Sequence, residues 1–192
     1  MPADLTTTSD MVAQIRPGIY RPDWSVVTKP VARAALMSRN RSRSRLREKW
    51  SQPLEATQDL VWRTVLELFA GFGRPPHLAE IGTEIDFSEE NIRMLVADLQ
   101  GHDLLATDKS ANMIVYAYPF TAHYTEHRVE FRGRELHAVC AIDALGVAAM
   151  FRLDAVIQSS CRVCGSRIEI STAQAGKSLA YVRPGDAVVW YI

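Results

Sequence analysis

The run Leu-His-Ala-Val-Cys-Ala-Ile-Asp-Ala-Leu-Gly-Val-Ala-Ala-Met, residues 136–150, places a thiol three positions before a carboxyl group in an otherwise apolar segment. The Ala and Leu content after Cys140 favours a helix, in which positions three apart share one face. Cys140 and Asp143 are therefore expected to face one small volume. A helix N-terminus lowers the pKa of a thiol, whereas apolar walls raise the pKa of a carboxyl group. The pair would offer a soft nucleophile beside a proton donor.

A packing role is the alternative for these two residues. Free cysteine is among the most buried residue types, and aspartate is a common helix cap. On spacing alone the packing role is the more frequent of the two.

The segment before this run predicts a hairpin that ends at the thiol. Val129 and Phe131 alternate with polar residues, a Gly-containing turn follows at 132–134, and the alternation then resumes. Such a hairpin places Cys140 at a strand-to-helix junction, which is a rigid position for a reactive group.

Three helices and a second hairpin are predicted between residues 55 and 120. An apolar stripe marks a helix over 57–72, a second short helix over 78–85 follows a Gly- and Pro-containing turn, and a third helix follows the capping residue Ser88. Two short strands are expected around a polar turn at 108–112. This order resembles a winged helix-turn-helix unit, whose third helix enters the major groove of DNA in regulators. Glu89 and Glu90 make the start of that helix acidic, which favours a structural or lid role over DNA binding.

Residues 1–54 are predicted to be a loose, Arg-rich lead. Prolines interrupt its first part, and basic residues crowd its second part at Arg33, Arg39, Arg41, Arg43, Arg45, Arg47 and Lys49. Such a run can bind nucleic acid through the phosphates, but no aromatic residue interleaves it for stacking on bases. A solvated, partly helical or disordered linker is the favoured interpretation.

Composition narrows the class of protein. The chain has 192 residues, of which 47% are hydrophobic, and its 22 basic residues balance 22 acidic ones. One domain or two small ones are expected, and no global charge draws the chain toward nucleic acid or an anionic membrane. Three cysteines fit poorly with a secreted disulfide framework, so we predict a cytoplasmic protein. No signal peptide and no membrane-spanning apolar run is expected.

A second pair of thiols occurs in Cys161-Arg-Val-Cys164-Gly. This turn has the shape of a zinc knuckle, but structural zinc needs four ligands and the sequence has no second such pair. Three interpretations stay open: a tight hairpin turn with incidental thiols, capture of a soft metal, or a redox dithiol. No histidine-based metal site is predicted, because the strand-like pattern around His123, His127 and His137 argues against a shared helical face.

These motifs resemble the organomercurial (alkylmercury) lyases of bacterial mercury resistance. The likeness lies in Tyr118-Pro-Phe-Thr, Cys140-Ala-Ile-Asp-Ala-Leu-Gly and Ser160-Cys161-Arg-Val-Cys-Gly, and it covers about residues 55–172. It implies an α+β fold with two domains after the lead. A three-helix winged-helix-like domain at 55–120 would precede a mainly antiparallel β catalytic domain at 121–192, with a short helix after the Cys-Ala-Ile-Asp block.

The resemblance also implies the chemistry. Cys140 would be the thiol that captures mercury, and Asp143 would shuttle the proton to the departing carbon. An organomercurial would be cleaved by protonolysis to a hydrocarbon and Hg(II), for mercury detoxification. No cofactor is expected, and exogenous thiols would accept the mercury. The expected partners are small organomercurial substrates and a mercuric reductase that receives Hg(II), with no membrane or nucleic-acid partner.

The chain departs from the family in one respect. The family's second catalytic cysteine lies well downstream of the Cys-Ala-x-Asp block, and the given sequence ends at Ile192 before such a residue. A shortened lyase, substitution by Cys161 or Cys164 as second metal ligand, and metal binding without turnover are the three explanations. The last would make the chain a non-catalytic mercury-binding or sensor protein of the same fold.

Overall fold

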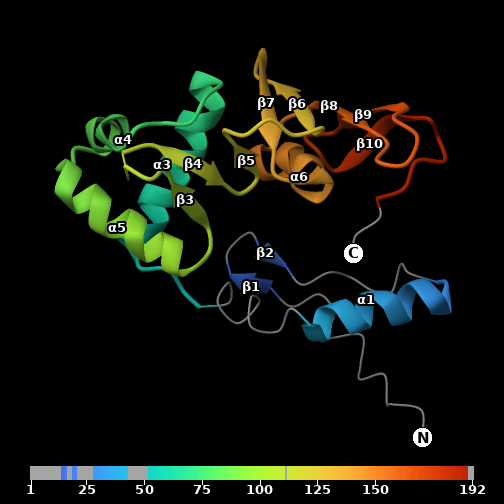
Figure 1. Ribbon diagram of the computed structural model, residues 1–192, viewed down its shortest axis with the longest axis horizontal. Helices are drawn as coiled ribbons and strands as arrows, with labels where there is room; N and C mark the ends of the chain where they lie inside the picture. Colours follow the sequence, from blue (N-terminus) through green and yellow to red (C-terminus); the bar gives the residue numbers. More distant parts are fainter. Residues whose placement is uncertain (1–13, 17–18, 21–27, 43–51, 111, 190–192) are drawn as a thin grey trace, which may run out of the picture. The chain divides into compact units, whose positions relative to one another are not determined.

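A computed structural model describes residues 14–16, 19–20, 28–42, 52–110 and 112–189. It divides the chain into two compact units, Met1–Leu54 and Glu55–Ile192 (Figure 1). In the first unit, strands β1 (Gln14–Arg16) and β2 (Ile19–Tyr20) pair antiparallel, and helix α1 spans Pro30–Ser42. Helix α1 holds the first part of the predicted Arg-rich run. The predictions for Arg43, Arg45, Arg47 and Lys49 lie outside the described residues.

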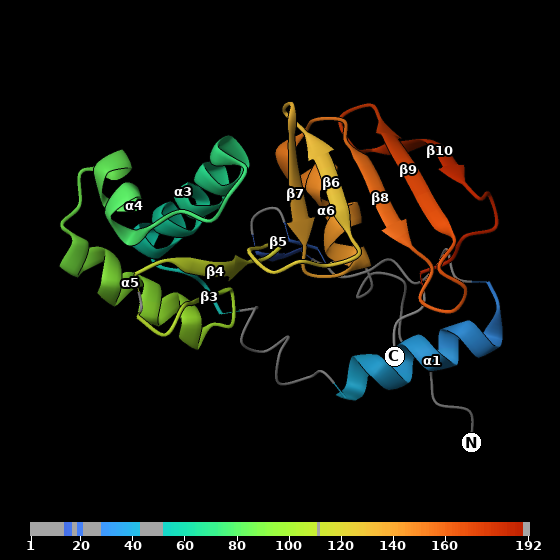
Figure 2. The same cartoon turned by 45° about the horizontal axis from the view of Figure 1, so that its top comes forward.

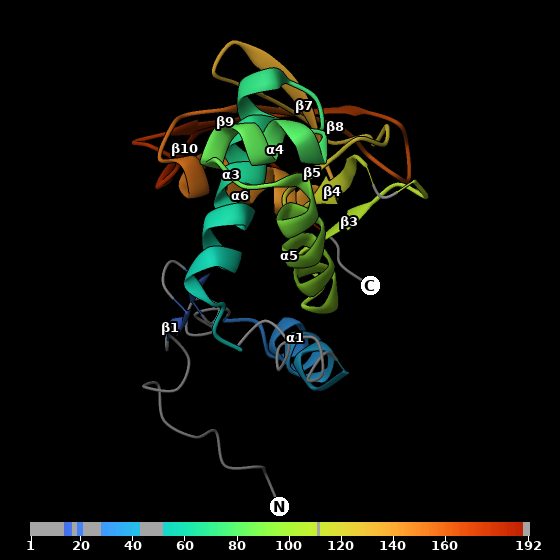
Figure 3. The ribbon, with the colours of Figure 1, turned by 90° about the vertical axis from the view of Figure 1, so that its left-hand side faces the viewer.

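The second unit begins with three helices, α3 (Ala56–Phe72), α4 (Leu78–Ile85) and α5 (Glu89–Gly101), which pack together at one end of that unit (Figure 3). Helix α3 ends because Gly73 adopts a left-handed φ of 70°. Helix α5 begins at Ser88, whose side chain accepts a hydrogen bond from the backbone N–H of Asn91 at 3.3 Å. None of the described helices is long and apolar enough to cross a membrane.

One antiparallel sheet of eight strands forms the rest of the second unit (Figure 2). Its strands run in the order β10-β9-β8-β6-β7-β5-β4-β3. Their bounds are β3 (Leu105–Thr107), β4 (Ile114–Ala117), β5 (Phe120–Thr121), β6 (Arg128–Phe131), β7 (Arg134–Ala138), β8 (Val156–Ser160), β9 (Arg167–Ala173) and β10 (Ser178–Arg183). The mixed fold with an antiparallel β part is confirmed. The sheet continues without a break through residue 120, and the division of 55–192 into two domains at that point stays a prediction.

Helix α6 (Ala141–Phe151) packs against β6, β7 and β8 on one face of the sheet (Figure 2). The helix begins inside the Cys-Ala-Ile-Asp block and not after it, because only Cys140 keeps an extended backbone, with φ −152° and ψ 175°. Beneath it the ring of the fully buried Phe120 lies 5.7 Å from Phe151, 6.1 Å from Phe131 and 5.6 Å from Phe69 between ring centroids. These four rings join α3, the sheet and α6 into one core.

Candidate active site

Cys140 and Asp143 meet where strand β7 passes into helix α6. Cys140 is the residue that caps the helix, and its carbonyl accepts the backbone N–H of Ala144 at 2.9 Å. The Cys140 thiol donates a hydrogen bond to Asp143 Oδ2, with sulfur and oxygen 2.9 Å apart. Both side chains are partly buried. The shared face expected from their spacing is therefore present.

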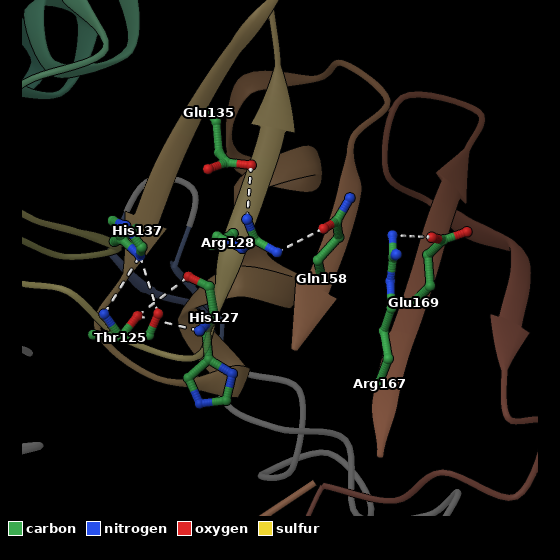
Figure 4. A network of polar contacts seen from close by, with 8 residues as sticks. All are labelled: Thr125, His127, Arg128, Glu135, His137, Gln158, Arg167 and Glu169. Atoms are coloured by element: carbon green, nitrogen blue, oxygen red, sulfur yellow. Dashed lines mark hydrogen bonds and ion pairs between the residues drawn. The ribbon is translucent and has the colours of Figure 1, made fainter. Parts of the chain in front are cut away.

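The backbone just before Cys140 forms hydrogen bonds with two neighbouring segments. The N–H of Val139 donates to the carbonyl of Pro119 at 2.9 Å. The hydroxyl of Thr125 donates to the carbonyl of Ala138 at 2.7 Å. Figure 4 shows Thr125 beside β7, where it also contacts His127 and His137. Because the preceding residues are bonded to neighbouring segments, the position of the thiol is fixed before the helix begins.

Burial governs the ionisation of this pair. It raises the pKa of the Cys140 thiol above its ordinary value, and the hydrogen bond to Asp143 adds to the increase. Burial likewise raises the pKa of Asp143, while the hydrogen bond from Cys140 opposes it. The expected increase at Asp143 is present. The expected lowering at Cys140 is wrong, because desolvation outweighs the helix N–H groups.

Two further titratable side chains, which the sequence did not single out for a role, lie within electrostatic reach of the pair. Burial, together with the nearby charge of Asp103 and, to a smaller degree, that of Asp143, raises the pKa of Tyr118 to about 12. Burial lowers the pKa of His127, and the charge of Asp143 opposes that shift. His127 Nδ1 lies 2.9 Å from the hydroxyl of Ser159 on β8. Tyr118 belongs to a quoted family motif, but nothing in the local pattern signals His127.

A polar cavity of about 190 Å³ lies on the face of β6 and β8. It is lined by Tyr124, Glu126, Arg128, Gln158, Ser159, Ser160 and Arg167. Figure 4 shows Arg128 between two acceptors: its guanidinium donates to Gln158 at 2.9 Å and to Glu135 at 3.5 Å. Ser159, which lines the cavity, is also the residue whose hydroxyl lies 2.9 Å from His127 Nδ1.

The second thiol pair lies in the turn between β8 and β9. Cys161 is half-buried, Cys164 is exposed, and both are free thiols. Cys164 Sγ lies 3.1 Å from the hydroxyl of Ser166. This hydroxyl, the backbone N–H of Ser166 and the Cys161 side chain lower the pKa of Cys164. Within the described part of the chain, no group of three or more His, Cys, Asp or Glu side chains is arranged to hold a metal ion.

Comparison with known proteins gives a consistent result. Residues 120–192 match a family model described as alkylmercury lyase. An alkylmercury lyase of Staphylococcus epidermidis is 25% identical over 146 residues, which are 76% of this chain and 64% of that protein. The crystal structure of the mercury-bound form of MerB2 aligns with a TM-score of 0.58 and 21% identity, over 68% of this chain and 62% of that one. The chain thus spans less than two thirds of either relative. The matches confirm the resemblance to the alkylmercury lyases, and the structural match confirms the fold.

Proposed function

We propose, from the premise that residues 120–192 belong to the alkylmercury lyase family, that this chain cleaves organomercurials to a hydrocarbon and Hg(II). The observation that carries the proposal is the 2.9 Å contact between Cys140 Sγ and Asp143 Oδ2 within the matched segment. A thiolate is a soft ligand and binds mercury where oxygen ligands do not. A carboxyl group beside it can protonate the carbon that leaves.

The first step is capture of the organomercurial by Cys140. The sulfur bonds to mercury, the ligand that mercury carried departs, and the thiol proton passes to Asp143 along the hydrogen bond between them. Burial raises the pKa of both groups, so the thiol keeps its proton until mercury displaces it. The same burial makes Asp143 a better proton acceptor than an exposed aspartate.

The second step is protonolysis of the carbon-mercury bond. Asp143 donates its proton to the carbon, and the electron pair of the broken bond forms the new carbon-hydrogen bond. The hydrocarbon leaves, Hg(II) stays on the Cys140 thiolate, and the Asp143 carboxylate balances its charge. No electron is transferred to or from another molecule. A positioned general acid contributes about 10²–10⁴-fold to such a rate.

Release of Hg(II) needs a second sulfur ligand, which exogenous thiols supply in this proposal. The proposed setting is the cytoplasm, where thiols stay reduced, with a mercuric reductase as the eventual recipient. The protein contributes Cys140 and Asp143, and no resident cofactor takes part.

We also propose that residues 55–120 act as a winged-helix-like domain with a structural role. Three helices followed by the β3-β4 hairpin support this assignment. Glu89 and Glu90 lie in the first turn of α5, and Arg93 pairs with Glu89 at 2.7 Å. This acidic helix start would repel phosphates, while the continuous sheet connects β4 to the strands that carry the candidate site.

The decisive experiment measures hydrocarbon release from phenylmercury and methylmercury in excess small thiol. We expect benzene and methane from the unaltered chain and none from Cys140→Ser. Asp143→Asn should still capture mercury, but it should release hydrocarbon about 10²-fold or more slowly, because the proton donor is gone. Circular dichroism of both variants controls for folding. Tight Cys140-dependent mercury binding without any hydrocarbon would contradict the lyase and identify a binding protein.

A further inference from the structure

We infer that Cys161 and Cys164 form a second metal site, in which their two sulfurs bind one Hg(II) ion at the turn between β8 and β9. The site uses neither Cys140 nor Asp143. It goes beyond the proposed lyase reaction, because it would hold mercury whether or not the chain cleaves organomercurials.

The turn brings the two sulfurs together before any metal arrives. The backbone N–H of Cys161 donates to the carbonyl of Ser166, and the N–H of Gly165 donates to the carbonyl of Cys161, both at 2.8 Å. Gly165 completes the turn with a left-handed φ of 72°, which favours glycine. Within this closed turn the Cys161 side chain contributes to the lowered pKa of the Cys164 thiol. Little chain entropy remains to be lost when both bind one ion.

The surroundings of Cys164 suit a metal-bound thiolate. The hydroxyl and the backbone N–H of Ser166 both reach its sulfur. Arg162, between the two cysteines, adds a positive charge on the exposed part of the turn. The side chain of Val163 is 95% exposed, so solvent and solutes reach the tip of the turn. A metal ion therefore has access to the pair without opening the core.

The number of donors selects the class of metal. Among the described residues, no third His, Cys, Asp or Glu joins the two cysteines in a metal-binding group. Structural zinc takes four ligands, and calcium and magnesium take oxygen ligands. Two thiolates alone suit a soft ion that forms stable two-coordinate complexes, and Hg(II) is such an ion. Binding forms two sulfur-mercury bonds, the two ligands that Hg(II) carried depart with the two thiol protons, and no oxidation state changes.

Strand β8 connects this turn to residues that surround Cys140. Cys161 directly follows β8, and Ser159 near the end of that strand lies 2.9 Å from His127 Nδ1. His127 in turn interacts electrostatically with Asp143. The pair at this turn accepts Hg(II) released at Cys140 and passes it to exogenous thiols, a use that rests on the proposed function.

The test uses a chain from which the thiol of Cys140 has been removed. The reduced full chain carrying Cys140→Ser is titrated with mercuric chloride in excess monothiol, followed by gel filtration. We expect about one Hg(II) retained per chain, with sulfur-to-mercury absorption in the ultraviolet in the protein fraction. Adding Cys164→Ser should abolish retention, because a single thiolate exchanges with the monothiol. Adding Val163→Ala, a matched change in the same turn that keeps both sulfurs, should leave retention intact.

Two results would overturn the inference. One is no retained mercury in the Cys140→Ser chain, and the other is equal retention after Cys161 and Cys164 are both changed to serine. Hydrocarbon release is measured separately on the chain that keeps Cys140 but carries Cys161→Ser and Cys164→Ser. Retained release supports two separate sites, whereas its loss would contradict them. An unaltered chain that releases no hydrocarbon would refute the lyase and leave the mercury titration fully interpretable.

Discussion

The thiol at the strand-to-helix junction, Cys140, and the thiol in the hairpin turn, Cys164, have pKa values shifted in opposite directions. The Cys140 thiol is partly buried and donates to a carboxylate, and both features raise its pKa. The Cys164 thiol is exposed and faces the hydroxyl and N–H of Ser166, which lower its pKa. Burial and the neighbouring groups decide the difference, because Cys140 is desolvated beside a carboxylate whereas Cys164 is exposed beside a hydroxyl and an N–H group.

This difference suggests a division of chemical work between the two regions. A thiol that keeps its proton beside Asp143 is suited to a reaction in which that proton must reach carbon. A thiol with a lowered pKa at an exposed turn is suited to holding a soft ion that small thiols can remove. Three measurements on variants test whether the two regions differ in this way.

The largest effect is expected at the core that supports the junction. Phe120→Ala removes a fully buried ring that contacts three other phenylalanines, and it should lower the free energy of unfolding by about 3–5 kcal/mol. Val163→Ala in the hairpin changes a side chain that is 95% exposed, and its effect should stay within about 0.5 kcal/mol. Urea unfolding of the two variants measures both. Equal losses would mean that the hairpin is as tightly packed as the junction.

A smaller difference in stability is expected between alanine substitutions at two glycines that share a left-handed backbone. Gly176, with φ 77°, lies against the backbone of Ala148 and Ala149 in α6, whereas Gly165, with φ 72°, has open space around it. Alanine at Gly165 should cost about 1–2 kcal/mol for its backbone conformation alone. Alanine at Gly176 should cost about 1–3 kcal/mol more, because the added carbon must displace the helix. Thermal unfolding checks the order, and a larger loss at Gly165 would contradict it.

The smallest effect is a change in the pH dependence of alkylation. Cys164 should react with iodoacetamide at lower pH than Cys140, because only the thiolate reacts and the two pKa values are shifted in opposite directions. Asp143→Asn should move the Cys140 profile to lower pH, since the carboxylate raises the pKa of that thiol. Mass spectrometry of the two cysteine peptides follows each site. Coincident profiles in the unaltered chain would remove the distinction between the two regions.

Local patterns were sufficient for the elements around the site. The apolar stripe over 57–72 predicted helix α3 to within one residue, the Gly turn predicted the β6-β7 hairpin, and the three-residue spacing predicted that Cys140 and Asp143 meet. Each of these features depends on residues close in sequence, where helix and strand periods apply directly.

Properties that depend on distant residues were not accessible in this way. The pKa of Cys140 was predicted in the wrong direction because burial by the sheet and α6 outweighs the helix terminus. His127 and Asp143 interact electrostatically in a sheet in which β6 also pairs with β8, and no local pattern specifies that second pairing. The strand order and the environment of the thiol therefore require the tertiary structure.

The register of the β6-β7 hairpin constrains how relatives of this chain can differ in length. Val129 pairs with Leu136 and Arg128 with His137, and Cys140 lies two residues after the end of β7. One residue added or removed between Gly133 and Cys140 would turn the thiol to the opposite face of the sheet. Alignment gaps are therefore expected in the exposed turn that holds Cys161 and Cys164, and they should be absent from the short stretch that leads to Cys140.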